Sequence, residues 1–137
     1  MARQITLAQA EAIVEACKAE AVSVGQPMNI AVVDDGANLV AFCSMDGTKL
    51  IGVDIAMKKA LTAVYFQTDT ADLVPLVQPG AALYGIESTS EGKLVVFGGG
   101  VLLKNAAGEV AGGVGVSAGS VEQDHQVAAA GRKAFSG

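Results

Sequence analysis

Apolar residues recur every three or four positions in three stretches of the chain, a spacing typical of helices that bury one face. The first stretch predicts a helix over 7–24, which Thr6 and Gln9 precede in the pattern of a capping box. The second predicts a helix that ends near Gln67. The third predicts a helix that follows a second capping-box pattern, Ser120 with Gln123, and continues to Ala134. Three amphipathic helices are therefore expected.

Five shorter runs rich in β-branched residues predict strands that are joined by turns. These strands cover 29–34, 39–44, 93–97, 101–104 and 109–117. Their links are of hairpin length, which requires antiparallel pairing, because parallel neighbours need crossovers of a dozen or more residues. A short helical turn over 71–77 and an irregular segment over 81–92 complete the order. The sequence thus predicts an α+β fold, a five-stranded antiparallel sheet flanked by helices.

Length and composition favour one domain, over 1–137, with no internal repeat or linker. The chain is 51% hydrophobic and only 17% charged, which is unusually apolar for a small monomer and favours subunit interfaces. A net charge of −5 without a Lys/Arg run argues against a nucleic-acid partner. No apolar run approaches the roughly 20 residues that cross a bilayer, and the amino-terminal stretch lacks a signal-peptide core. We therefore expect a cytoplasmic protein without a membrane partner.

Glycine clusters mark two places where the backbone is expected to be unusual. Gly98, Gly99 and Gly100 lie between two predicted strands, and no predicted helix start follows them, which disfavours a phosphate-binding loop. They fit a tight hairpin with positive φ angles, or a position where another backbone or a flat ligand approaches closely. The glycines within 112–115 leave room along the last strand for another element, most often a helix.

His125 is the only histidine, and it lies in the first turns of the last predicted helix beside Glu122. One chain therefore cannot supply a bis-histidine metal site, although a symmetric oligomer could supply two histidines. A neighbouring carboxylate would fix the tautomer of the ring. Two interpretations stay open: a solvent-exposed helix residue, or a functional one that acts as general acid/base or binds a metal together with Glu122.

Asp46 and Lys59 are further candidates for chemistry, each with a structural alternative. Asp46 lies in a turn between a strand and a helix, where aspartate commonly bonds the backbone. Lys59 lies one turn beyond Ile55 at the edge of an apolar stripe, either as a solvated lysine or as a cation that faces a ligand. Cys17 and Cys43 lack metal-binding spacing and are predicted to be small buried hydrophobes.

Three stretches, in order, resemble the GlcG/HbpS family, also called the haem-degrading domain family and related to the C-terminal domain of PduO. They are Met45-Asp46-Gly47 leading into 54–63, then 96–100, then 112–117 continuing into 121–124. A fourth segment, 79–87, is similar to members encoded with diol and glycerol dehydratase systems. Together these stretches cover nearly the whole chain.

The resemblance implies a profilin-like fold with a five-stranded antiparallel sheet, in agreement with the element order above. It also implies homo-oligomers, as dimers, tetramers or octamers. Family members bind haem or free iron, and some are associated with corrinoid handling or glycolate use. This chain departs from the family pattern because its histidine, His125, lies elsewhere than the haem ligand of some relatives, and because Asp69 replaces the usual proline before Thr70.

The first hypothesis is a haem-, tetrapyrrole- or metal-binding accessory protein of small-molecule catabolism. Its ligand would lie in an apolar subunit cleft near the 98–100 loop and Thr70, with buried apolar area supplying most of the affinity and one axial ligand fixing the iron. A broader alternative is an accessory protein that stabilises a partner enzyme through its oligomeric surface.

The second hypothesis is an enzyme that acts on a small oxygenated metabolite by isomerase- or lyase-type acid-base chemistry. It is motivated by Asp46, Lys59, Glu87 and His125, the ionisable groups within or beside the resembling stretches. His125 would serve as general acid/base, Lys59 would hold a carboxylate or enolate, and a carboxylate would orient the imidazole.

Overall fold

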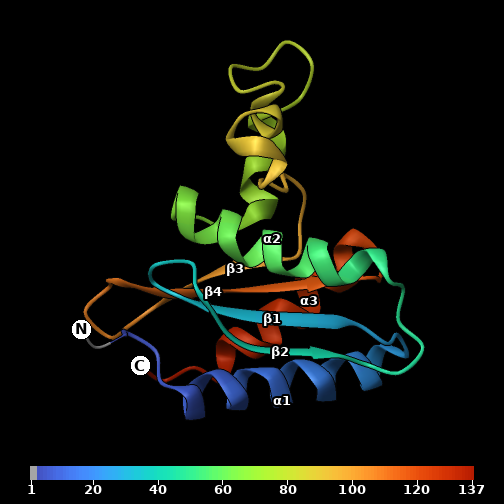
Figure 1. The fold of residues 1–137 in the computed structure, drawn as a ribbon, viewed down its shortest axis with the longest axis vertical. Helices are drawn as coiled ribbons and strands as arrows, with labels where there is room; N and C mark the ends of the chain where they lie inside the picture. The colour runs from blue at the N-terminus through green and yellow to red at the C-terminus, as the bar shows by residue number, and fades with distance from the viewer. Residues whose placement is uncertain (1–2) are drawn as a thin grey trace.

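Two helices cover one face of a four-stranded antiparallel sheet, and a third helix covers the other face (Figure 1). The computed structural model describes residues 3–137. Its elements are α1 (Leu7–Val24), β1 (Asn29–Asp34), β2 (Leu39–Ser44), α2 (Ile51–Phe66), the 3-10 helices η1 (Thr70–Leu76), η2 (Ile86–Ser88) and η3 (Ser90–Gly92), β3 (Gly100–Lys104), β4 (Val110–Ser117) and α3 (Val121–Lys133). The strand order is β2-β1-β4-β3. The prediction of an α+β fold with an antiparallel sheet is therefore confirmed.

Helices α1 and α3 begin at the predicted capping boxes. The Thr6 hydroxyl accepts a hydrogen bond from the Gln9 N–H at 3.1 Å, while the Gln9 side chain accepts one from the Thr6 N–H at 2.8 Å. Ser120 and Gln123 repeat this reciprocal pair at the start of α3. Such caps satisfy backbone donors that a helix start leaves unpaired. Within residues 3–137, no helix is both long and apolar enough to span a membrane.

The central strands β1 and β4 are buried because helices lie on both of their faces. Every residue of β1 is buried, and β4 is buried from its second residue onward. Helix α2 lies directly on β4, where a Cβ at Gly115 would overlap the carbonyl oxygen of Ala56 and a Cβ at Gly113 would lie 2.6 Å from that of Ala60. The expectation that these glycines make room for a helix is confirmed.

The five-strand prediction is wrong, because 93–97 forms no strand. This segment instead runs along α2: Leu94 is buried, and the Val95 N–H donates to the Thr62 hydroxyl of α2 at 3.0 Å. Strand β3 pairs only with β4, so the predicted hairpin between 93–97 and 101–104 is also absent from the described chain. The β-forming side chains of this segment pack on a helix, which a sequence pattern does not distinguish from packing in a sheet.

The two cysteines differ in their surroundings. Cys17 of α1 is fully buried, its Sγ donates to the Val127 carbonyl at 3.4 Å, and burial raises the pKa of its thiol to about 12. Cys43 of β2 is only half-buried, and partial burial raises the pKa of its thiol as well. The prediction of a buried hydrophobe is confirmed for Cys17 and is wrong for Cys43, whose edge strand leaves it partly open to solvent.

We expect a charged thiol reagent to modify one cysteine of the folded protein slowly at pH 8, because only Cys43 is accessible and reaction requires the thiolate. Two thiols should react after unfolding in urea. Counting released reporter groups measures this, with Cys43→Ala as the control that abolishes the native reaction. Rapid labelling of both thiols in the native state would contradict the burial of Cys17.

We expect Gly115→Ala to lower the free energy of unfolding by about 3 kcal/mol or more, because the added methyl meets the backbone of α2, which cannot move aside locally. Gly80→Ala is the matched control. Its φ is +87° with open space around it, so only the strain of a left-handed backbone, about 1–2 kcal/mol, is expected. If urea denaturation gave the same loss in the free energy of unfolding for both variants, direct contact between α2 and β4 would be contradicted.

Candidate functional site

The side chain of Lys59 is completely buried between α2, β4 and α3. Its Nζ donates to Oδ2 of Asp124 at 2.8 Å and to the Val116 carbonyl at 2.9 Å, and it lies 5.0 Å from the centre of the Phe97 ring. A lysine beside an aromatic face gains a further electrostatic attraction. The interpretation of Lys59 as a solvated residue is therefore wrong, and its ammonium faces Asp124 rather than an open cleft.

Burial disfavours the charged forms of Lys59 and Asp124, whereas the contact between the two side chains favours their charged forms. Burial lowers the pKa of the Lys59 ammonium and raises the pKa of the Asp124 carboxyl, while their mutual hydrogen bond and charge oppose both shifts. The other carboxylate oxygen of Asp124 accepts the Gly119 N–H at 2.9 Å. The pair thus joins α2 to the start of α3, and removal of either partner would leave an uncompensated charge in the interior.

The glycine loop at 98–100 closes over the Lys59 side chain. Gly99 has a φ of +122°, and a Cβ there would lie 2.5 Å from the Nζ of Lys59. The hydroxyl of the buried Thr70 accepts the Gly100 N–H at 2.9 Å, and Gly100 begins β3. The expectations of a positive φ and a close backbone approach are confirmed. The tight hairpin is wrong, because Gly99 and Gly100 pack against Lys59 and Thr70 instead of turning between two strands.

A hollow of about 320 Å³ lies on the outer side of this loop and is called the His125 hollow here. It is lined by Ala71, Val74, Gly98, Val121, Glu122 and His125. His125 is half-buried, so the interpretation of a solvent-exposed histidine is only partly correct. Its Nδ1 is buried and has no hydrogen-bond partner. An unpaired buried polar atom costs about 1–3 kcal/mol, so a turn of the ring that brings this nitrogen to a partner would be favourable.

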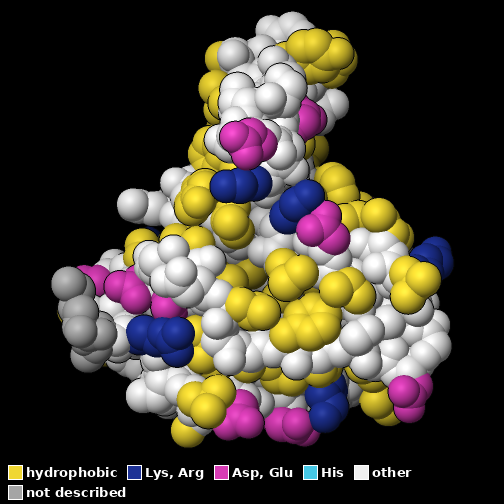
Figure 2. Space-filling view, viewed as in Figure 1, with side chains coloured by type: hydrophobic (Ala, Val, Ile, Leu, Met, Phe, Trp, Pro, Cys, Tyr) yellow, Lys and Arg dark blue, Asp and Glu magenta, His cyan; other side chains and the backbone are white. Residues whose placement is uncertain are grey.

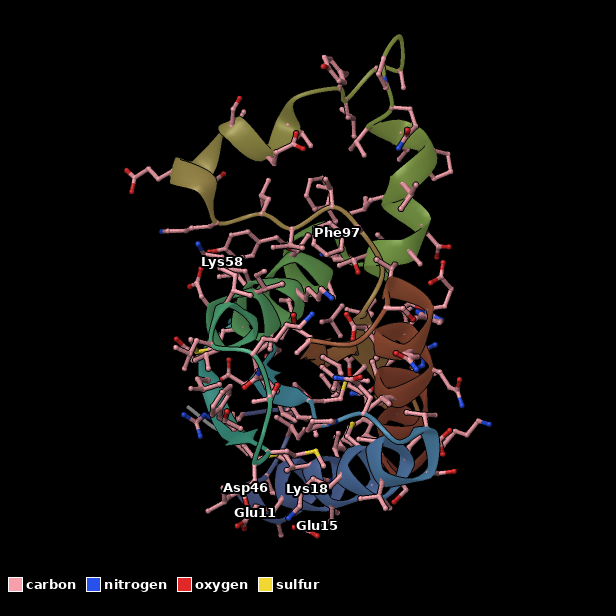
Figure 3. The ribbon with its side chains drawn as sticks, turned by 90° about the vertical axis from the view of Figure 1, so that its right-hand side faces the viewer. Glu11, Glu15, Lys18, Asp46, Lys58 and Phe97 are labelled. Atoms are coloured by element: carbon pink, nitrogen blue, oxygen red, sulfur yellow. The ribbon has the colours of Figure 1, made fainter. Side chains whose placement is uncertain are left out.

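The structure brings some of the candidate residues together and separates others. Gly98, Glu122 and His125 line one hollow, whereas Lys59 and Thr70 lie beneath the loop. Asp46 lies in another depression, beside Lys18 and Cys43. Figure 3 shows Asp46 near Lys18 and far from Phe97, which lies over Lys59. Glu87 belongs to η2 and lines neither of these two hollows.

A metal ion would find few ligands here. Among residues 3–137, no group of three or more His, Cys, Asp or Glu side chains could hold one. The predicted pair of His125 and Glu122 therefore amounts to two donors from one chain at most. Structural zinc sites use four protein ligands, so a metal site of this kind is not complete within a single subunit.

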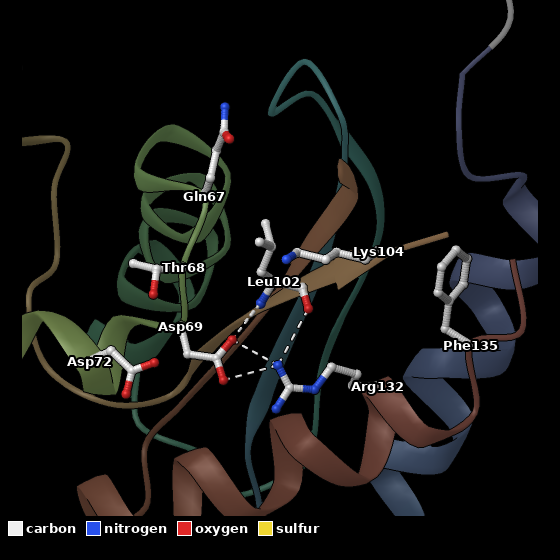
Figure 4. Close-up of a pocket in the computed structure, with 8 residues that line it drawn as sticks. All are labelled: Gln67, Thr68, Asp69, Asp72, Leu102, Lys104, Arg132 and Phe135. Atoms are coloured by element: carbon white, nitrogen blue, oxygen red, sulfur yellow. Dashed lines mark hydrogen bonds and ion pairs between the residues drawn. The ribbon is translucent and has the colours of Figure 1, made fainter. Parts of the chain in front are cut away.

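Asp124 and Asp69 are two buried or half-buried carboxylates whose roles sequence reasoning missed. Asp124 lies three residues before Val127 and four before Ala128, both buried, so helical spacing could have assigned it to the inner face of α3. Asp69 pairs with Arg132 at 2.7 Å and accepts the Leu102 N–H at 2.9 Å, in a second hollow of about 410 Å³ (Figure 4). No sequence signal pointed to this contact.

Fold and site together define a small α+β domain with a buried lysine–aspartate pair beneath a glycine loop and a single-histidine apolar hollow above it. A family model described as "Haem degrading protein HbpS-like" matches residues 5–133. The chain belongs to this HbpS-like family, which confirms the resemblance seen in the sequence. The match extends across all of the helices and strands described above.

Similar proteins come from both sequence and structure. The chain is 40% identical over 133 residues to an "Uncharacterized 15.0 kDa protein in dhaT-dhaS intergenic region" of Citrobacter freundii, covering 96% of this chain and 92% of that one. It is 46% identical over 102 residues to the corrinoid adenosyltransferase PduO of Citrobacter freundii, covering 74% of this chain but only 30% of PduO. A solved PduOC:haem complex has a TM-score of 0.91 and 38% identity, with 95% of this chain and 94% of that chain covered.

We expect Lys59→Met and Asp124→Asn each to lower the free energy of unfolding, Lys59→Met by about 3–5 kcal/mol, because it leaves a carboxylate buried without its partner. The double variant should lose clearly less than the sum of the two single losses, since neither charge remains. Urea denaturation of all four proteins measures the coupling. Lys58→Met is the control, because Lys58 pairs with Asp54 at a more exposed position of the same helix. Additive losses would contradict a coupled buried pair.

Proposed function

We propose that this protein is a cytoplasmic haem- or tetrapyrrole-binding accessory protein of small-molecule catabolism that works as a homo-oligomer. The observation that carries the proposal is the unpartnered, buried Nδ1 of His125 beside an apolar hollow. Membership of a family described as haem-degrading and the likeness to a PduOC:haem complex support it. The number of subunits, whether two, four or eight, stays a prediction.

The lining of the His125 hollow fits the needs of a flat apolar ring. Ala71, Val74 and Val121 offer apolar contacts, and Gly98 lets the backbone approach the ring closely. Tetrapyrrole affinity comes mostly from buried apolar area, with few polar groups to fix the orientation. The hollow of about 320 Å³ is at the small end of ligand pockets, so a second subunit would cover the remaining surface of the ring.

Each lining residue then has a distinct part in binding. The imidazole of His125 would hold the metal, and a turn of the ring that brings Nδ1 to it would relieve the cost of leaving this nitrogen buried without a partner. Glu122 is exposed at the rim, where its carboxylate would meet polar substituents or water. The Lys59–Asp124 pair supports the loop from below without touching the ligand. Haem, when bound, supplies an iron centre whose reactivity its axial ligand tunes.

The enzymatic hypothesis finds less support. An acid-base reaction needs its catalytic groups within hydrogen-bond reach of one substrate. Lys59 has no exposed surface, and Asp46 borders a different depression from His125. A metal ion alone is also less favoured, because His125 and Glu122 supply only two protein donors from one chain.

We expect titration of the purified protein with hemin to shift the Soret band and to saturate at one hemin for each site. His125→Ala should weaken binding by about tenfold or more, equivalent to about 1.4 kcal/mol, and should change the position of the bound Soret band, because the axial ligand is lost. Gln126→Ala is the matched control, since Gln126 is exposed on the same helix and bonds Glu20 instead.

The outcomes separate the protein's function from the role of one residue. Absence of a Soret shift up to high micromolar hemin would contradict the proposal that the protein binds haem. A saturating shift that is identical in the wild type and in His125→Ala would retain haem binding and remove His125 as the ligand. Circular dichroism of each variant checks that the fold is intact.

A further inference from the structure

The chain projects a segment in which no residue is fully buried. Residues 74–93, called the arm here, rise above α2 and return to it (Figure 1). Leu73 and Leu94 at its two ends are buried, but every residue between them is exposed or half-buried. Its backbone hydrogen bonds close local turns, such as Leu83 N–H to Leu76 C=O at 2.9 Å. Ordering such a segment costs conformational entropy that burial of apolar area normally offsets.

The arm nevertheless carries apolar side chains. Leu76 is 46% exposed and Tyr84 is 66% exposed. Leu83 and Ile86 are half-buried. Two adjacent residues, Ser90 and Glu91, also hold left-handed backbone conformations that are costly outside glycine. A shaped apolar segment of this kind is expected to pack against another surface.

Helix α2 below the arm has an apolar face that the fold leaves uncovered. Its inner face packs on β4, while its outer face presents Ile51 and Tyr65, which are 65% and 54% exposed. The charged residues on the outer face, Asp54 and Lys58, pair with each other at 2.8 Å. A helix with large apolar side chains on its outer face as well as its inner face suits an interior or an interface. Figure 2 shows hydrophobic side chains around a few charged ones over this part of the molecule.

We propose that the arm of one copy packs on the outer face of α2 in a second copy of this chain, and that the second arm does the same in return. When a two-fold axis relates two copies, the arm of each copy can contact the α2 face of the other. The same contact then forms twice, and both apolar surfaces are covered. The arm and the outer face of α2 together offer the roughly 20–30 residues for each partner that a stable interface uses. This inference specifies the subunit contact of the homo-oligomer proposed above.

The first experiment compares charge substitutions on the full chain. Tyr84→Asp in the arm and Tyr65→Asp on α2 should each raise the Kd of self-association by about 30-fold or more, as expected for an interfacial tyrosine. Val22→Asp is the control, because Val22 is 71% exposed on α1, which lies on the other face of the sheet. Sedimentation velocity over a concentration series measures mass against the 13.7 kDa of one chain, and circular dichroism checks folding.

The second experiment mixes the two variants. If each arm contacts the partner's α2, the mixture of Tyr84→Asp and Tyr65→Asp restores one intact contact, and heterodimers form where neither variant pairs with itself. A wild type that stays monomeric, variants that associate like the wild type, or a mixture without recovery would each overturn the exchanged arrangement. Hemin titration of the same proteins tests the ligand proposal separately, because neither tyrosine lines the His125 hollow.

Discussion

Direct contact between the backbone of α2 and the glycine positions of the sheet is the constraint on which the rest of this structure depends. At Gly113 and Gly115 a single methyl group would collide with carbonyl groups of α2, so the helix lies much closer to β4 than side chains would allow. Because α2 lies so close to β4, the position of its side chains relative to the sheet is fixed. Lys59 consequently projects beneath the 98–100 loop instead of into solvent.

The buried pair of Lys59 and Asp124 follows from that geometry and explains why the glycine loop has its shape. The ammonium lies under Gly99, and the loop can bend over it only because Gly99 has no side chain and adopts a φ of +122°. A buried ion pair is not by itself a source of stability, since the loss of hydration offsets much of the attraction. Its effect here is positional: it ties the start of α3, and with it His125, to the floor of the hollow.

The apolar residues of the chain lie in two kinds of location, the interior and the surface. Part of it fills the two cores on either side of the sheet. The remainder lies on the outside, around the His125 hollow, along the outer face of α2 and on the arm, where a ligand and a second subunit would cover it. These exposed apolar residues support the homo-oligomer proposed above.

Much of the architecture follows from the sequence alone. Capping boxes and periodicity determined α1 from Leu7 to Val24, β-branched runs located the central strands, and glycines in β4 indicated the helix that lies on it. These features are local, so a pattern within a few residues contains the information. Family membership and the presence of one histidine were also readable without coordinates.

Tertiary structure decided what depends on residues distant in the chain. The segment 93–97 has the composition of a strand, yet it packs on α2, because local propensity does not specify which neighbour a β-forming side chain meets. Lys59 finds a partner 65 positions away, and no spacing rule anticipates a charge paired across two helices. For the same reason, no sequence pattern indicated that Asp46 and His125 lie in different hollows. Sequence thus determined the elements and the family, while only the packing of α2 and α3 on the sheet decided which side chains share a site.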